Sequence, residues 1–245
     1  MAYNTLKAIG PRINYTEKFK KEKASLEKEF HKYLDEWQQT AVMVVNYAKK
    51  YGDKEELHHK PYGQWETFTW TEVSEIMFAV ASALLSLDIK EEDKIGIFSA
   101  NRAEWHLSDL GSLLIRCITV PIYATNTEEE CAYIINDSGI KVLFVGRQVH
   151  YDTAYPLLEK CPSLDKIIVF HRGTKVHDDK RVIMWDDFLN DGRATPHKSE
   201  IEEIMKRAHY EDICTIIYTS GTTGEPKGTV HTHKTLMHNA WAVGR

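Results

Sequence analysis

The residues best suited to chemistry lie together near the end of the chain, from Thr219 to Gly228. Glycines in this stretch let the backbone turn sharply and approach a ligand closely. Hydroxyl groups and backbone amides supply donors and Lys227 supplies a positive charge, a combination that suits a polyphosphate. The stretch is not the common nucleotide-binding loop, which ends in Gly-Lys-Ser/Thr, because Pro226 precedes the lysine and Gly228 follows it. It predicts a phosphate-binding loop of another kind.

A strand and a helix are expected on either side of this loop. The apolar run from Ile213 to Tyr218 predicts a buried strand that leads directly into the loop. Residues 233–245 predict a helix that has just begun, and we expect no strand to follow and complete a unit beyond the loop. Because a domain rarely ends straight after its ligand loop, we expect the chain to be part of a longer polypeptide.

Strands and helices alternate through the rest of the chain. This alternation indicates an α/β fold with a largely parallel sheet flanked by helices. Strands are expected at residues 56–59, 64–69, 94–99, 118–123, 141–146, 166–170, 182–185 and 213–218. Helices are expected at residues 14–39, 41–51, 70–87, 101–116, 127–138 and 152–161 and within residues 186–207.

Helix starts are marked by residues that can cap the free backbone amides. Thr69, Asn101 and Thr127 each have a glutamate three residues later, which is capping-box spacing, and Thr40 is a further candidate cap. Pro121 cannot donate to a strand ladder, so it predicts a strand end or a bulge.

Composition indicates an ordinary globular protein rather than a nucleic-acid-binding one. The chain has 31 basic and 36 acidic side chains and a formal net charge of −5, which argues against nucleic acid as the main partner. None of the four cysteines forms a Cys-x-x-Cys pair, so each is interpreted as a buried reduced thiol in an intracellular setting. We find no secretory signal and no transmembrane segment. The charged helix expected at residues 14–39 is interpreted as a solvated surface helix, with a peripheral membrane contact as the alternative.

The stretch from Tyr218 to Gly228 resembles the phosphate-loop signature of the adenylate-forming enzymes. These are the acyl-CoA synthetases, the adenylation domains of peptide synthetases, and the luciferases. Their pattern is Tyr/Phe-Thr-Ser-Gly-Ser/Thr-Thr-Gly-x-Pro-Lys-Gly, and every fixed position matches. Three upstream segments resemble the long-chain acyl-CoA synthetase branch: Ile95–Trp105, Val120–Thr127 and Tyr133–Ser138.

The resemblance implies a fold and a reaction. Residues 40–245 would form an incomplete N-terminal AMP-binding domain, preceded by a charged helical extension at residues 1–39. The implied reaction is the ATP-dependent activation of a long-chain fatty acid to acyl-CoA through an acyl-adenylate, with release of AMP and pyrophosphate. ATP, Mg²⁺ and coenzyme A as co-substrate are therefore implied, in a cytoplasmic enzyme.

The resemblance also implies roles for individual residues. Lys227 would contact the β- and γ-phosphates, and His233 would lie near the acyl carboxylate and the α-phosphate as a catalytic residue. No metal ligand is assigned, because the family's Mg²⁺ and adenosine contacts lie beyond Arg245, and we expect the chain alone to be inactive. The implied ATP-binding residues are Thr219, Ser220, Gly221, Thr222, Thr223, Gly224, Glu225, Pro226, Lys227 and Gly228.

Three alternatives stay open at this point. The loop could serve a phosphotransferase or NTPase, although Pro226 and the absence of Ser/Thr after Lys227 disfavour this. The chain could be a non-catalytic nucleotide-binding fragment, or it could adenylate another carboxylate, such as an amino acid. The histidines at positions 58, 59, 171 and 177 have no partner at metal-ligand spacing and are interpreted as solvated loop residues.

Overall fold

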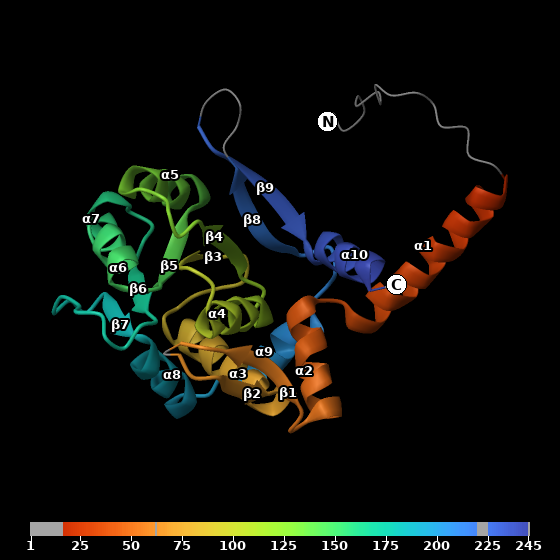
Figure 1. Cartoon of the computed structure of the whole chain (residues 1–245), viewed down its shortest axis with the longest axis horizontal. Helices are drawn as coiled ribbons and strands as arrows, with labels where there is room; N and C mark the ends of the chain where they lie inside the picture. The colour runs from red at the N-terminus through yellow and green to blue at the C-terminus, as the bar shows by residue number, and fades with distance from the viewer. Residues whose placement is uncertain (1–16, 62, 220–224, 245) are drawn as a thin grey trace.

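The computed structural model describes residues 17–61, 63–219 and 225–244, and strands and helices alternate through it as expected (Figure 1). Its helices are α1 (Glu17–Trp37), α2 (Thr40–Tyr51), α3 (Trp70–Ser86), α4 (Ala103–Leu114), α5 (Glu128–Ser138), α6 (Gln148–Ala154), α7 (Leu157–Lys160), α8 (Trp185–Ala194), α9 (Lys198–Lys206) and α10 (His233–Val243). Its strands are β1 (Glu55–His59), β2 (Glu66–Thr69), β3 (Lys94–Phe98), β4 (Ile118–Ile122), β5 (Ile140–Val145), β6 (Lys166–Val169), β7 (Val182–Met184), β8 (Ile213–Thr219) and β9 (Lys227–Thr232).

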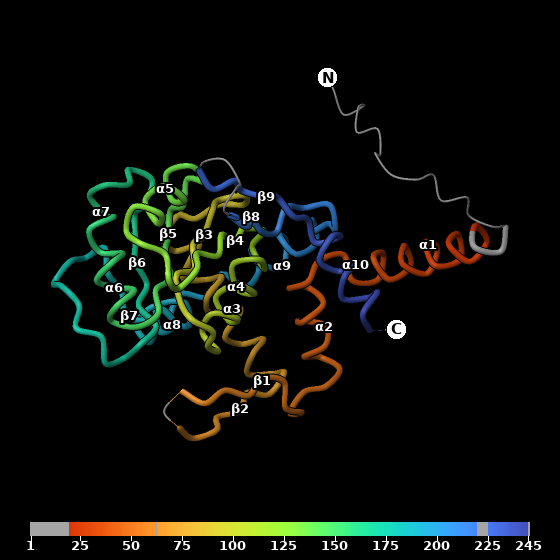
Figure 2. The backbone as a smooth tube through the Cα atoms, turned by 45° about the horizontal axis from the view of Figure 1, so that its top comes forward, coloured from red at the N-terminus to blue at the C-terminus, as the bar shows by residue number. Residues whose placement is uncertain are grey.

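The main sheet of the described residues has the order β7-β6-β5-β3-β4-β8-β9. All its neighbouring strands are parallel except β8 and β9, which confirms the predicted α/β class with a largely parallel sheet. Strands β1 and β2 form a separate antiparallel hairpin outside this sheet (Figure 2).

Helices cover both faces of the sheet, and the strands between them are buried on both sides. On β5, Val142 and Phe144 pack with helices α2, α3, α4, α8 and α9, whereas Leu143 and Val145 pack with α5, α6 and α7. Successive side chains of a strand point to opposite faces. A strand covered on both faces therefore reads as a continuous apolar run, which is why these strands were predictable.

The connections of the sheet reverse direction at β3. The chain passes from β3 through α4 to β4 on one side, and later enters β5 on the other side of β3 before continuing to β6 and β7. Helices α4 and α6, which follow β3 and β5, consequently lie on opposite faces of the sheet. Such a reversal is the place where open α/β sheets form a ligand crevice.

Strand β9 corrects the expectation that no strand would follow the loop. It pairs with β8 in an antiparallel hairpin and forms the outer strand of the sheet. Its side chains from Lys227 to Val230 are exposed. An edge strand without a buried face lacks the apolar run or the alternation that identifies strands in a sequence.

Two of the four expected helix caps are confirmed. Thr69 and Thr127 each form a complete capping box with the glutamate three residues later. The cap at Thr40 is wrong, because Gln39 occupies the cap position and Thr40 is already helical. The cap at Asn101 is also wrong, because helix α4 is capped at the next residue and Glu104 binds the Arg102 guanidinium instead.

Two expectations about prolines and helix continuity need correction. The helix expected at residues 152–161 is divided into α6 and α7, and Pro156 stands at the start of α7. Pro121 lies inside β4 and in register with Ile97 of β3, not at a strand end or bulge. On the other side of β4, the register pairing with β8 is confined to Thr119 and Thr215, so the proline interrupts no ladder there.

The N-terminal half of helix α1 extends away from the sheet, and its C-terminal half packs on the last helix, α10 (Figures 1 and 2). Phe30 and Leu34 are buried together with Met237 of α10 and lie against Trp241.

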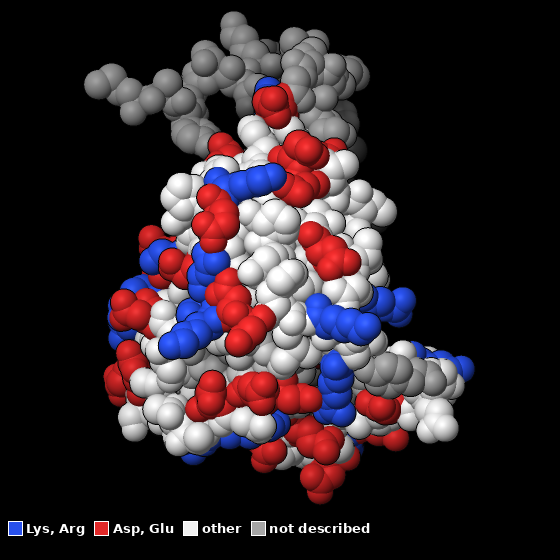
Figure 3. Space-filling model, turned by 90° about the vertical axis from the view of Figure 1, so that its left-hand side faces the viewer, with Lys and Arg blue, Asp and Glu red and all other residues white. Residues whose placement is uncertain are grey.

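None of the helices in the described ranges is long and apolar enough to cross a membrane. On the face formed by α5, α6 and α7, acidic and basic side chains are interspersed without a continuous basic area (Figure 3).

Candidate phosphate-binding hairpin

The predicted loop joins the two antiparallel strands at the edge of the sheet. It begins at the carboxyl end of β8, which is parallel to β4, and it ends where β9 starts. The register places Thr219 opposite Lys227 and Tyr218 opposite Gly228, so the first and last residues of the signature face each other. The central residues Ser220, Gly221, Thr222, Thr223 and Gly224 lie outside the described part of the chain.

Tyr218 anchors the strand that enters the loop. Its side chain is 5% exposed, and its hydroxyl donates a hydrogen bond of 2.5 Å to Oδ2 of Asp137 at the end of α5. Burial raises the pKa of Tyr218 above its usual range, and the hydrogen bond with Asp137 raises it further, so the hydroxyl stays protonated. A side chain on Gly228 would place a Cβ 2.8 Å from Cγ2 of Ile216 and 3.1 Å from Cζ of Tyr218. A glycine thus fits at position 228 because the side chains of Ile216 and Tyr218 leave little room for a Cβ there.

The charged and polar ends of the loop are open to solvent. Thr219, Glu225 and Lys227 are exposed, and Pro226 is half-buried. Lys227 forms no ion pair with any described residue. An exposed ammonium beside the amides and hydroxyls of a turn is a donor set that fits phosphate oxygens.

His233 lies at the other end of β9 from Lys227. A six-residue strand at about 3.3 Å per residue separates the two by roughly 20 Å. The imidazole is 1% exposed, and its Nδ1 accepts a hydrogen bond from the Thr40 amide (3.4 Å) and lies 3.0 Å from the Thr40 hydroxyl. Burial lowers the pKa of His233 to about 4. The structure therefore brings Thr219, Lys227 and Gly228 together, but it does not bring His233 to them.

A second polar site, which the sequence interpretation missed, lies at the carboxyl edge beyond β3 and β5. It is a cavity of about 120 Å³ lined by six basic side chains: His59, Lys60, Arg102, Arg147, His150 and His171. These residues come from separate segments of the chain. No local motif joins them, so only the fold identifies the cluster.

The amino-acid sequence is similar to that of known enzymes. A family model described as AMP-binding enzyme matches residues 44–244. A long-chain-fatty-acid–CoA ligase of Xenopus laevis is 30% identical over 200 residues, which are 81% of this chain and 26% of the ligase. A long-chain-fatty-acid–CoA ligase of Mycobacterium tuberculosis is 29% identical over 206 residues, covering 84% of this chain and 33% of the ligase.

A solved structure supports the same assignment. The crystal structure of an anthranilate CoA ligase in complex with anthranoyl-AMP has a TM-score of 0.69 and 27% sequence identity, and the similarity covers 84% of this chain and 38% of that one. The chain thus spans about a quarter to a third of the curated relatives that it matches. Since the family model extends over most of its length, the chain belongs to the AMP-binding enzyme family of adenylate-forming ligases.

Proposed function

We propose that this chain forms the ATP phosphate-binding part of a ligase that activates a long-chain fatty acid to its acyl-CoA. The family uses ATP and a carboxylate substrate. The observation that supports the proposal best is the hairpin register, which holds the exposed Lys227 opposite Thr219 where the loop begins and ends.

The proposed reaction has two steps. A carboxylate oxygen attacks the α-phosphorus of ATP, and the bond to the leaving pyrophosphate breaks, which gives an acyl-adenylate. The thiol of coenzyme A then attacks the acyl carbon and releases AMP. Lys227 and the donors from Thr219 to Gly228 would bind the β- and γ-phosphates and stabilise the charge that develops on the leaving group.

Mg²⁺ bound together with ATP would neutralise further phosphate charge. Among the described residues there is no group of three or more His, Cys, Asp or Glu side chains that could hold a metal ion, so we assign no metal ligand. The hairpin's own contribution is positional, because Tyr218 is fixed by Asp137 directly before the first loop residue.

The names of the relatives support a long-chain fatty acid as the substrate. The similarity to an anthranilate CoA ligase favours an aromatic carboxylate as the second candidate. We also propose that residues 1–39 are an extension and that residues 40–245 form part of the AMP-binding domain, which the match to residues 44–244 supports.

For His233 the contacts favour a role other than the catalytic one that the resemblance implies. Its ring is buried against the start of α2, and its backbone amide donates to the carbonyl of Asp212 at 3.1 Å. We propose that His233 positions the end of β9 against α2, and that Lys227 alone of the two acts on phosphate.

Calorimetric titration of the chain with Mg-ATP tests the proposal. Replacing a charged hydrogen-bond donor removes about 1.5–3 kcal/mol. Lys227→Ala should therefore weaken ATP binding roughly 10- to 100-fold. Lys180→Ala, which removes an exposed lysine from another loop, is the matched control and should leave the affinity unchanged. Equal affinities of the wild type and Lys227→Ala would refute the assignment of the loop.

The activity itself is tested by incubation with ATP, palmitate and coenzyme A, followed by detection of AMP and thioester. Because the chain spans only a quarter to a third of its curated relatives, we propose that it does not complete the reaction alone. Robust thioester formation would contradict this. Replacing palmitate by anthranilate in the same assay separates the two substrate candidates if turnover appears.

A further inference from the structure

The cavity beyond β3 and β5 lies at the place where the sheet connections reverse. Its walls are the loop after β3 (Ser99 to Arg102), Arg147 after β5 with His150 in the first turn of α6, His171 after β6, and the β1–β2 hairpin. Ligands of open α/β sheets bind at the carboxyl ends of the strands at such a reversal. The volume of about 120 Å³ is far larger than one water needs, so a small anion fits.

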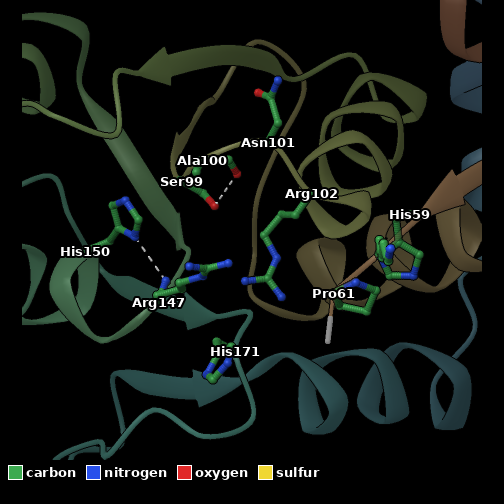
Figure 4. A pocket seen from close by; sticks show the side chains of 10 residues that line it. His59, Pro61, Ser99, Ala100, Asn101, Arg102, Arg147, His150 and His171 are labelled. Atoms are coloured by element: carbon green, nitrogen blue, oxygen red, sulfur yellow. Dashed lines mark hydrogen bonds between the residues drawn. The ribbon is translucent and has the colours of Figure 1, made fainter. Parts of the chain in front are cut away.

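The charge of the lining is of one sign. Among the described residues, the lining contains besides the six basic side chains Pro61, Ser99, Ala100 and Asn101, and no carboxylate. Figure 4 shows the guanidinium groups of Arg102 and Arg147 pointing toward one another from two different loops. Glu104, outside the lining, pairs with Arg102 and reduces the repulsion between the two guanidinium groups, and an anion between them would reduce it further.

Arg102 is held in place for such a role. Its Nε and Nη2 donate to Glu104 at 2.8 and 2.6 Å, and its guanidinium carbon lies 5.5 Å from the centre of the Phe170 ring. These two bonds leave Nη1 for a further acceptor. Glu104 lies outside the lining of the cavity, where it orients Arg102 and offsets part of its positive charge.

The loops around the cavity are joined by His150. Its Nδ1 accepts a hydrogen bond of 3.0 Å from the Arg147 amide, and its ring lies edge-on to Phe98 at the end of β3, with the ring centres 5.0 Å apart. A side chain on Gly146 would place a Cβ 2.5 Å from Oγ of Ser99, so the loops after β3 and β5 approach as closely as a glycine permits. The arginine positions are therefore set by the fold before any ligand binds.

We propose that this cavity is a second anion site, which binds a phosphate group independently of the β8–β9 loop. Guanidinium groups pair with phosphate through parallel N–H···O bonds, and two converging arginines match a tetrahedral dianion better than a carboxylate. The nearest cavity strand, β3, is separated from β8 by β4. At about 4.8 Å per strand, the loop starts roughly 10 Å or more from the cavity, so Lys227 does not contact its occupant. The ligand class is inorganic phosphate, pyrophosphate or the phosphate group of a small metabolite.

Titration calorimetry of the chain at constant ionic strength tests this, with inorganic phosphate, pyrophosphate and glycerol phosphate as probes and acetate as the carboxylate probe. We expect saturable binding of a phosphate probe that is weakened about tenfold or more in Arg147→Gln. Arg193→Gln, which changes an exposed arginine on α8, is the matched control and should bind as the wild type does. Lys227→Ala should also keep this binding, which separates the cavity from the nucleotide loop.

A second variant guards against misfolding as the cause. Asn101→Asp adds a carboxylate to the exposed rim of the cavity and should abolish binding while the circular dichroism spectrum stays that of the wild type. Inorganic phosphate binding best would identify a free-ion site, and glycerol phosphate binding best would identify a metabolite site. The proposal is overturned if no phosphate probe saturates the wild type, if acetate binds equally well, if Arg147→Gln leaves the affinity unchanged, or if Lys227→Ala abolishes it.

Discussion

His233 should make the stability of the protein depend on pH in a way that one substitution removes. Its ring is buried between β9 and the start of α2, and burial lowers its pKa to about 4 from an ordinary value of 6.5. Asp212 acts in the opposite direction and Arg116 in the same direction as burial. The folded state thus favours the neutral imidazole, whereas the unfolded chain protonates it below pH 6.5.

The size of the effect follows from the shift. At roughly 1.4 kcal/mol per pKa unit, the largest loss of unfolding free energy is about 3 kcal/mol, and about 2 kcal/mol of it is lost between pH 7 and pH 5. The stabilisation is complete above pH 6.5 and is lost as the pH falls toward 4. Burial raises the pKa of Asp109 to about 6, so Asp109 gives the opposite slope in the same range. The wild type alone can therefore appear nearly independent of pH.

The assay must compare two proteins so that the contribution of Asp109 cancels. Urea unfolding of the wild type and His233→Asn is followed by circular dichroism at pH 7 and pH 5. Asparagine offers an amide near the Thr40 contact but does not titrate. We expect the wild type to lose about 2 kcal/mol more than the variant between these pH values. His31→Asn, at an exposed position on α1, should behave as the wild type does. Identical pH dependence of the wild type and His233→Asn would refute the reasoning.

Two further substitutions test the packing around the hairpin and the sheet. Tyr218→Phe removes the hydroxyl that donates to Asp137 and should lower the unfolding free energy by about 1 kcal/mol. It should also weaken ATP binding. Unchanged urea unfolding and unchanged calorimetric affinity would show that this bond does not position the loop. Gly192→Ala would place a Cβ 2.0 Å from the backbone carbonyl oxygen of Ala79, so it should separate α8 from α3 and lower thermal stability by about 3 kcal/mol or more. Gly244→Ala, where the nearest atom is 3.3 Å away, is the control, and equal melting temperatures of the two variants would contradict the steric argument.

The parts of the fold that could be predicted are those with a local signal. Strands such as β5 are buried on both faces and read as apolar runs, and the Thr69 and Thr127 caps depend on residues three positions apart. Strand β9 has no such signal, because it is stabilised by pairing with β8 and not by burial of its own side chains. Thr40 could not be interpreted correctly for a related reason, since its hydroxyl contacts a histidine 193 residues later.

The candidate site likewise has a part that could be predicted from the sequence and a part that could not. The loop from Thr219 to Gly228 is contiguous, so its residue types alone predict a phosphate-binding loop. The anchor of that loop was not predictable, because Asp137 lies 81 residues before Tyr218. The basic cavity joins segments that follow three strands, and two of its histidines, His59 and His171, taken alone resembled solvated loop residues.

The position of the hairpin depends on side chains at its two ends more than on the sheet itself. Between β4 and β8 the register pairing is confined to Thr119 and Thr215, so the main-chain ladder gives β8 little support. At the loop end, Tyr218 is tied to α5 through Asp137, and at the other end His233 is buried against α2. Both anchors flank the residues proposed to bind phosphate without belonging to the group that would contact phosphate. A loop that must hold several donors in fixed positions needs such rigid flanks, because a displacement of about 1 Å in a binding group is enough to reduce catalysis strongly.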